Sequence, residues 1–236
     1  MKSLYFSRSK RLANSFVFIL PLLILYEAGI AFYGSALKNT ADTITKTPLT
    51  LFGKNGSLVF NLLVIVFLLV AVFYIEKEHN LNVFLFFPMF IESVVYALFI
   101  GYVAGFVVYK VLFPYLLAIP FHWETGGGIL LSIGAGVYEE IVFRLLLVSA
   151  FYLFITKVLK ASKPLSAVVS IIFSALIFTI MHYIGGLSGA FTYTSFMFRM
   201  LSGIILACIF MFRGLGIAVY THAIYDVFAV LKLFQG

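Results

Sequence analysis

The feature that most constrains this chain is its series of long apolar runs. Seven of them approach or exceed the roughly 20 residues that a helix needs to cross a bilayer, near 14–34, 57–75, 87–113, 128–155, 165–184, 195–213 and 215–233. Inside a bilayer, a helix is the element that satisfies all its backbone polar groups within one segment. The sequence therefore predicts an all-α, polytopic transmembrane helix bundle of about seven helices, or eight if a further half-helix lies around Pro114–Pro120.

The composition excludes a soluble domain. Of the 236 residues, 63% are hydrophobic and only 11% are charged, whereas soluble domains contain about a quarter charged residues. Too few polar side chains remain to cover a soluble fold, while lipid can solvate apolar outer faces. No internal repeat divides the chain, so we expect a single integral membrane domain over residues 1–236, with its motifs in a core of about 128–233.

The net charge of +7 does not indicate a nucleic-acid-binding protein, because the basic residues cluster beside apolar runs. Two clusters stand out, one ahead of the first run and one in a short loop: Lys2, Arg8, Lys10 and Arg11, then Lys157, Lys160 and Lys163. Membrane proteins concentrate Lys and Arg in their cytoplasmic loops. We therefore expect a multi-pass protein of the cell membrane with a cytoplasmic N-terminus, the lipid bilayer as a partner and no nucleic acid.

A few polar side chains interrupt the apolar runs. They are Glu27, Glu92, Glu139, Glu140, Arg144, His182, Arg199, His222 and Asp226. A charged residue at the centre of a membrane helix costs about 2.5–3.5 kcal/mol on insertion scales, so such residues face the bundle interior and mark functional sites. We interpret Glu27, Glu92 and Arg199 as interhelical pairs or snorkelling groups, and the remaining six as site candidates.

The spacing of the acidic pair suggests different roles for its two members. Glu140 and Arg144 are four residues apart, so on an α-helix they share a face and can form an ion pair. Glu139 is rotated by about 100° from Glu140 and points to another neighbour. A buried carboxylate without a cation of its own is suited to act as a general base.

The last apolar run repeats the four-residue spacing with His222 and Asp226. There the carboxylate could orient the imidazole and fix its tautomer. His182 ends the segment Phe178-Thr179-Ile180-Met181-His182, close to the end of the fifth run.

These residues occur in three motifs whose order and helical placement resemble the CAAX protease and bacteriocin-processing family, which includes type II CAAX prenyl endopeptidases. The motifs are Glu139-Glu140-x-x-x-Arg144, Phe178-x-x-x-His182 and His222-x-x-x-Asp226. The resemblance implies a glutamate-dependent intramembrane endopeptidase that requires no cofactor and no metal. It also implies a role for each position. Glu139 would activate water, Glu140 and Arg144 would hold the helix, His182 would position the water, and His222 with Asp226 would stabilise the oxyanion.

Several alternatives remain open at this point. An ionised Asp226 would repel an oxyanion, so it either orients His222 or contacts the reacting groups. Glu139, His182 and His222 also form the ligand set of many catalytic zinc sites, although two neutral histidine donors would make a metal unnecessary. Buried Glu and His can instead relay protons in a transporter, and an immunity or scaffold protein could keep the motifs for shape. The expected substrate is a membrane-anchored protein or peptide.

Overall fold

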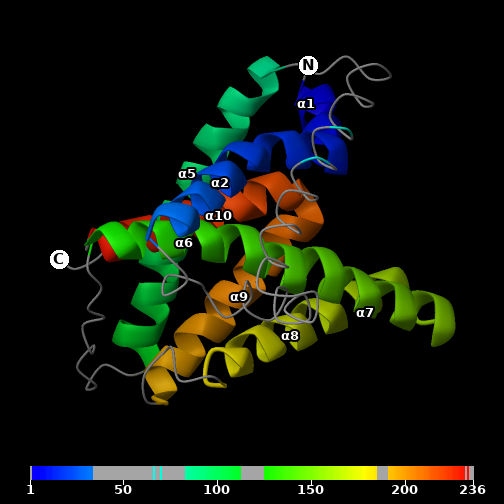
Figure 1. Ribbon diagram of the computed structural model, residues 1–236. Coiled ribbons are helices and arrows are strands. Elements are labelled where there is room, and N and C mark those ends of the chain that lie inside the picture. Colours follow the sequence, from blue (N-terminus) through cyan, green and yellow to red (C-terminus); the bar gives the residue numbers. More distant parts are fainter. Residues whose placement is uncertain are drawn as a thin grey trace, which may run out of the picture.

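The structure is a computed structural model that describes residues 2–33, 66, 70, 83–112, 125–184, 191–231 and 233 (Figure 1). These residues form helices and their connections, with no β-strand among them. The predicted all-α fold class is confirmed.

The described part of the chain is almost entirely helical. Their bounds are α1 Lys2–Ser9, α2 Leu12–Tyr33, α5 Phe86–Gly105, α6 Thr125–Glu139, α7 Ser149–Leu153, α8 Lys163–Met181, α9 Tyr193–Arg213 and α10 Leu215–Val230. A 3-10 turn, Val83–Leu85, precedes α5, and π-helical segments span Phe106–Leu112, Glu140–Val148 and Phe154–Val158. The segments from Thr125 to Val158 thus follow each other as one long helical stretch (Figure 1).

Helices occupy six of the seven predicted runs. The remaining run, 57–75, lies almost entirely outside the described residues, as does the alternative half-helix around Pro114–Pro120. The sequence did not predict α1, because its eight residues are too few and too polar for a membrane span.

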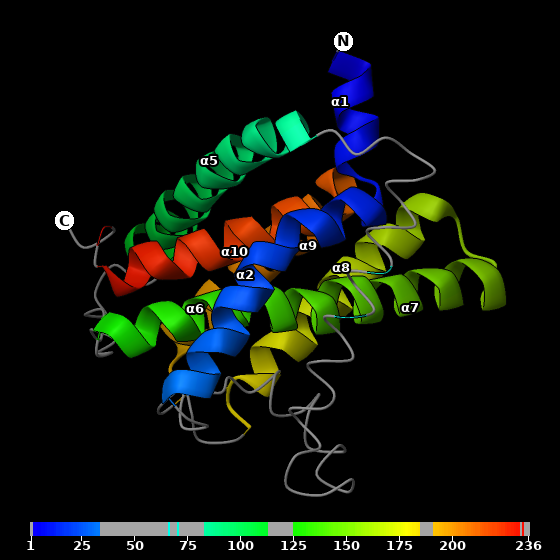
Figure 2. The ribbon, with the colours of Figure 1, turned by 45° about the horizontal axis from the view of Figure 1, so that its top comes forward.

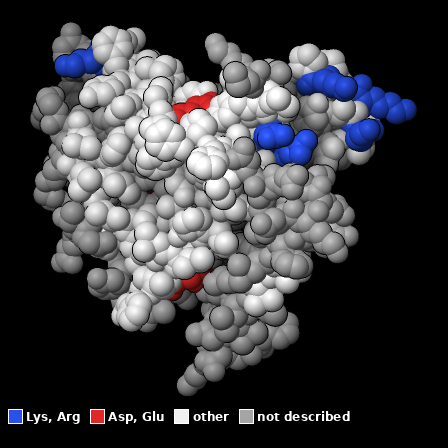
Figure 3. Space-filling view, turned by 90° about the horizontal axis from the view of Figure 1, so that it is seen from above, with Lys and Arg blue, Asp and Glu red and all other residues white. Residues whose placement is uncertain are grey.

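Five helical stretches in the described part of the chain are long and apolar enough to cross a membrane, and α10 is a shorter apolar helix. Many large hydrophobic side chains point outward, for example Phe87 and Val95, which are 72% and 57% exposed. Uncharged side chains cover most of the described surface in Figure 3, and its Lys and Arg residues lie towards the edges. These features are those of a multi-pass membrane protein whose outer faces contact lipid.

Helix α10 lies at the centre of the bundle, where it packs against α2, α5, α6 and α9 (Figure 2). Its small and aliphatic residues from Leu215 to Val219 are buried. A turn at Gly214, with φ of 91°, separates α10 from α9. That conformation is strained for residues with a side chain, so glycine permits the direct connection.

Helices α6 and α10 approach each other most closely at Gly136. A Cβ atom at this position would lie 2.6 Å from the Cβ of Ala223 and 2.7 Å from its backbone nitrogen. A larger residue would force the two backbones apart. The glycine therefore brings the end of α6, three residues further on, next to His222.

Candidate active site

The polar residues of the bundle interior meet where the end of α6 and the π-helical segment Glu140–Val148 pass α10 and the end of α8. All six side chains that the sequence singles out are connected here by close contacts: Glu139, Glu140, Arg144, His182, His222 and Asp226. Glu139, Glu140, Arg144 and His222 are buried. The cost of placing so many charges in an apolar bundle makes this cluster the strongest site candidate among the described residues.

Glu140 links two elements of the site. One carboxylate oxygen lies 3.3 Å from Arg144 Nε, so the predicted pair forms, and the other lies 2.8 Å from His222 Nδ1. Arg144 also stacks over the ring of Phe178, 4.4 Å from its centroid. Glu140 therefore joins the π-helical segment to α10 and fixes the His222 ring, the orienting contact that the sequence had suggested for Asp226.

The helix that carries the acidic pair changes its hydrogen-bonding pattern at the site, because the π-helical segment begins at Glu140. The wider π-helical turn is rare and is frequently found at functional sites. Ser174 of α8 donates a hydrogen bond of 2.6 Å to the backbone oxygen of Phe143 within this segment. This contact ties α8 to the irregular stretch of helix.

His182 caps the end of α8 and turns one ring nitrogen towards the site. Its Nδ1 lies 2.8 Å from the backbone oxygen of Phe178. Because a carbonyl oxygen can only accept, Nδ1 carries the proton, and a neutral His182 presents an accepting Nε2. In that tautomer His182 donates through Nδ1 to the backbone and not through the nitrogen that faces Glu139.

Glu139 faces both histidines without touching either of them. Its Oε2 lies 3.8 Å from His182 Nε2 and 3.9 Å from His222 Nε2. The same oxygen is buried and has no hydrogen-bond partner among the described residues. These separations are too long for direct hydrogen bonds, so a hydrogen-bonded link between the groups would need a bridging molecule.

Asp226 lies on the more accessible side of His222. Its Oδ2 is 3.4 Å from His222 Nε2, and its side chain is 28% exposed. It therefore contacts the same nitrogen that faces Glu139, while Glu140 occupies the opposite side of the ring. This placement sets Asp226 and Glu139 at the same nitrogen of the His222 ring.

The donor types at the centre of the site are ones that metals bind, although no group of three His, Cys, Asp or Glu side chains in the described residues is arranged to hold an ion. Glu139, His182 and His222 supply one carboxylate oxygen and two imidazole nitrogens, the set found in many catalytic zinc sites. Arg144 opposes this use, because its fully buried guanidinium adds positive charge beside Glu140.

Two further polar contacts between helices were not predicted from the sequence. Tyr138 donates a hydrogen bond to Glu27 of α2, next to the catalytic candidate Glu139. Arg213 pairs with Glu92 of α5, 121 residues away. Local spacing gives no signal for contacts across such separations, although the presence of Glu27 and Glu92 within apolar runs had indicated interhelical partners.

Residues 121–228 match the family described as Type II CAAX prenyl endopeptidase Rce1-like. The matched segment contains all six candidate residues, and the family resemblance that the motifs suggested is confirmed. No curated protein and no solved structure matches the chain.

Proposed function

We propose that this protein is an intramembrane endopeptidase that hydrolyses a peptide bond by glutamate-activated water, because residues 121–228 match a family of prenyl endopeptidases. The observation that carries the proposal is the position of Glu139 Oε2, buried and 3.8 and 3.9 Å from two histidine nitrogens. A water in that space would touch a base and two imidazoles at once. General-base catalysis of this kind contributes about 10²–10⁴-fold to a rate.

In the proposed reaction, Glu139 takes one proton from the water while the oxygen forms a bond to the carbonyl carbon of the scissile peptide. The tetrahedral intermediate then collapses, its C–N bond breaks, and Glu139 returns the proton to the leaving amine. The products are a carboxylic acid and an amine, and the reaction consumes one water molecule. Activity would need no cofactor and no metal.

The two histidines would have different tasks. His182 Nδ1 donates a hydrogen bond to the Phe178 carbonyl. Its Nε2 would therefore accept a hydrogen bond from the second O–H of the water, which would direct a lone pair of the water oxygen at the carbonyl carbon. His222, when protonated, would donate from Nδ1 to Glu140 and from Nε2 to the oxyanion. Asp226, whose Oδ2 lies 3.4 Å from the same Nε2, would favour the imidazolium through its negative charge, because the single hydrogen of Nε2 would point to the oxyanion.

The substrate would be a membrane-tethered protein or peptide precursor, because the reacting groups lie among helices suited to a bilayer. A screen of tagged, membrane-anchored candidate proteins, each co-expressed with wild type or with Glu139→Gln, tests this function. We expect at least one candidate to be shortened only by the wild type at equal protein levels. Identical fragment patterns for the two proteins, together with Glu139-dependent proton flux in vesicles, would instead support a proton relay.

We also propose that the N-terminus and the loop carrying Lys157, Lys160 and Lys163 are cytoplasmic, as the Lys and Arg distribution suggests. The chain has one cysteine, Cys208, and Ser162 of this loop is exposed. In a Cys208→Ser background, Ser162→Cys should resist a membrane-impermeant thiol reagent on intact cells and react after lysis. Labelling on intact cells would reverse the orientation.

A further inference from the structure

The charged residues that the sequence set aside as interhelical or snorkelling groups differ in their partners. Glu92 is paired with Arg213, and Glu27 accepts a hydrogen bond from Tyr138. Arg199 of α9 has no carboxylate within ion-pair distance in the part of the chain that the structure describes. A cation within a membrane helix that lacks an anionic partner is costly and points to a function.

Neutral groups hold the Arg199 guanidinium in place. Its Nη1 donates to the hydroxyl of Tyr183 at 3.0 Å and also to the hydroxyl of Ser195. The guanidinium lies over the Tyr183 ring, 5.2 Å from its centroid. Nε and Nη2 make no hydrogen bond to a described residue, and Arg199 is only partly buried. Within the described ranges, Arg199 is therefore an oriented cation with donors that have no partner.

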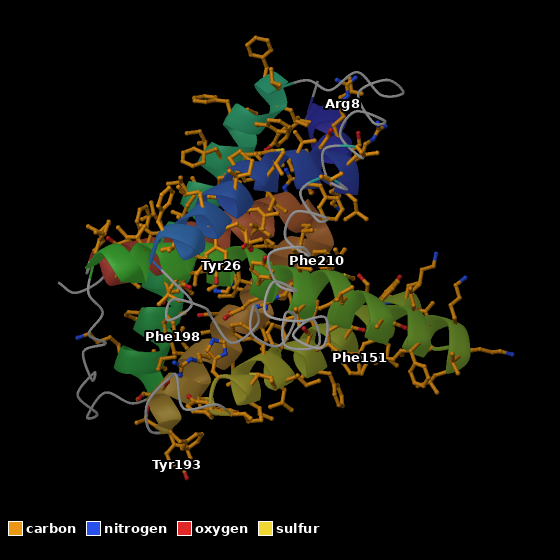
Figure 4. All side chains as sticks on the ribbon, viewed as in Figure 1. Arg8, Tyr26, Phe151, Tyr193, Phe198 and Phe210 are labelled. Carbon is orange, nitrogen blue, oxygen red and sulfur yellow. The ribbon has the colours of Figure 1, made fainter. Side chains whose placement is uncertain are left out.

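Arg199 lies at the end of the α8–α9 pair that carries His182. Gly203 of α9 packs against Phe178 of α8, and Arg199 precedes Gly203 by one helical turn on the same face. Its neighbour Phe198 is directed elsewhere, stacked on Tyr225 of α10. Figure 4 shows Phe198 partway along α9 and Tyr193 at its outer tip. Arg199 thus lies beside Tyr183, the residue that follows His182.

We propose that Arg199, held by Tyr183 and Ser195, binds a carboxylate of the substrate beside the Glu139–His182 site. This inference rests on the proposed proteolytic function and adds a substrate class, peptides that carry a carboxylate close to the scissile bond. The planar guanidinium fork matches a carboxylate geometrically, and such charge-assisted hydrogen bonds are about twice as strong as neutral ones. The carboxylate belongs either to an acidic side chain or to the substrate's C-terminus.

The test is a binding measurement that does not depend on turnover. Purified Glu139→Gln protein in uncharged lipid nanodiscs is titrated with lipid-anchored, fluorescent peptide pools that end in a free carboxylate or in an amide. A second pair of pools, all with amide ends, carries Glu or Gln at fixed positions. Fluorescence anisotropy gives the dissociation constants.

We expect one acid pool to bind at least about tenfold more tightly than its neutral counterpart, as hydrogen bonds to charged groups allow. Adding Arg199→Gln should reduce that ratio to about one, and Arg199→Lys should retain part of it. Lys163→Gln removes the same charge at the opposite end of α8 and should leave the ratio unchanged. A difference between the pools with free and amidated ends would identify the C-terminal carboxylate as the group bound. A difference between the Glu and Gln pools would identify an acidic side chain.

The inference would be overturned if the neutral and acidic pools had similar dissociation constants in the protein that retains Arg199. It would also be overturned if the difference between the pools persisted in Arg199→Gln. An effect of Arg199→Gln that appears only when the nanodiscs contain phosphatidylglycerol would assign the residue to lipid phosphate instead, which also overturns it. Melting curves of the Arg199 variants identify misfolding, and Ser195→Ala, which removes one hydroxyl, should lower the ratio in a folded protein. Arg199-dependent binding without cleavage in any screen would contradict the proteolytic function and leave the carboxylate site standing.

Discussion

Two groups of charged residues within the helix bundle satisfy their polar atoms very differently. In the first, Glu92 of α5 accepts hydrogen bonds from Arg213 Nη2 at 2.7 Å and from the Tyr5 hydroxyl at 2.6 Å. Arg213 also packs over the ring of Phe6, 4.2 Å from its centroid. Burial, followed by the hydrogen bond to Glu92, raises the pKa of Tyr5, so the hydroxyl remains a neutral donor. These contacts connect α1 with α5 and α9.

The second group, the candidate active site, leaves many of its atoms without partners. Glu139 Oε2, Glu140 Oε2 and all three Arg144 nitrogens are buried without a hydrogen bond among the described residues. In the first group, only Arg213 Nη1 is in that state. Unsatisfied buried polar groups are destabilising, and they persist where a bound water or substrate completes them. The difference supports our proposal that Glu139 takes part in the chemistry, whereas the paired Glu92 would contribute to stability.

The largest expected effect comes from Arg144→Ala, which should both destabilise the protein and abolish cleavage. The fully buried Glu140 would lose its ion pair with the Arg144 guanidinium, and breaking a buried pair in this way costs about 3–5 kcal/mol. Thermal unfolding in detergent measures the change in stability. The double variant Glu140→Gln/Arg144→Met should recover much of the stability without activity, and a single variant as stable as wild type would contradict this description of the pair.

A smaller effect is expected for Asp226→Asn, which should retain cleavage within about tenfold of wild type. The contact of Asp226 with His222 is 3.4 Å long and partly exposed, so an amide can replace it at a modest cost. The rate of substrate cleavage at matched protein amounts is the measurement. A dead Asp226→Asn would show that this carboxylate takes part directly in the chemistry.

The smallest effect, none within error, is expected from exhaustive chelation of the wild-type protein. A glutamate base and two histidines can activate water and hold an oxyanion without a metal. Cleavage that stops on chelation and returns with zinc would assign Glu139, His182 and His222 to a metal site instead.

The sequence predicted most of the described helices because the bilayer leaves a chain few alternatives: apolar runs of about 20 residues become helices. It also predicted the Glu140–Arg144 contact, which survives although the α-helix assumed for it is a π-helical segment. Sequence spacing is sufficient to predict a contact when both partners lie on one helix.

The contacts between helices could not be derived in this way. Glu140 and His222 are 82 residues apart, so only the packing of α6 against α10 at Gly136 reveals that Glu140, and not Asp226, holds Nδ1 of His222. The accepting state of His182 Nε2 likewise depends on a backbone carbonyl that no motif identifies. Motif order indicated which residues belong to the site, and the packing determines which atoms face one another.

The most direct measurement compares Glu139→Gln with Glu92→Gln, one equivalent substitution in each charge group, by melting temperature and by cleavage rate. We predict that Glu139→Gln lowers cleavage by at least about 10²-fold. The melting temperature should be unchanged or higher, because the substitution removes a buried charge whose Oε2 has no hydrogen bond among the described residues. Glu92→Gln should lower the melting temperature through loss of its ion pair with Arg213 and keep cleavage in the folded fraction. Full cleavage by Glu139→Gln, or loss of cleavage by a folded Glu92→Gln protein, would contradict the division of roles between the two groups.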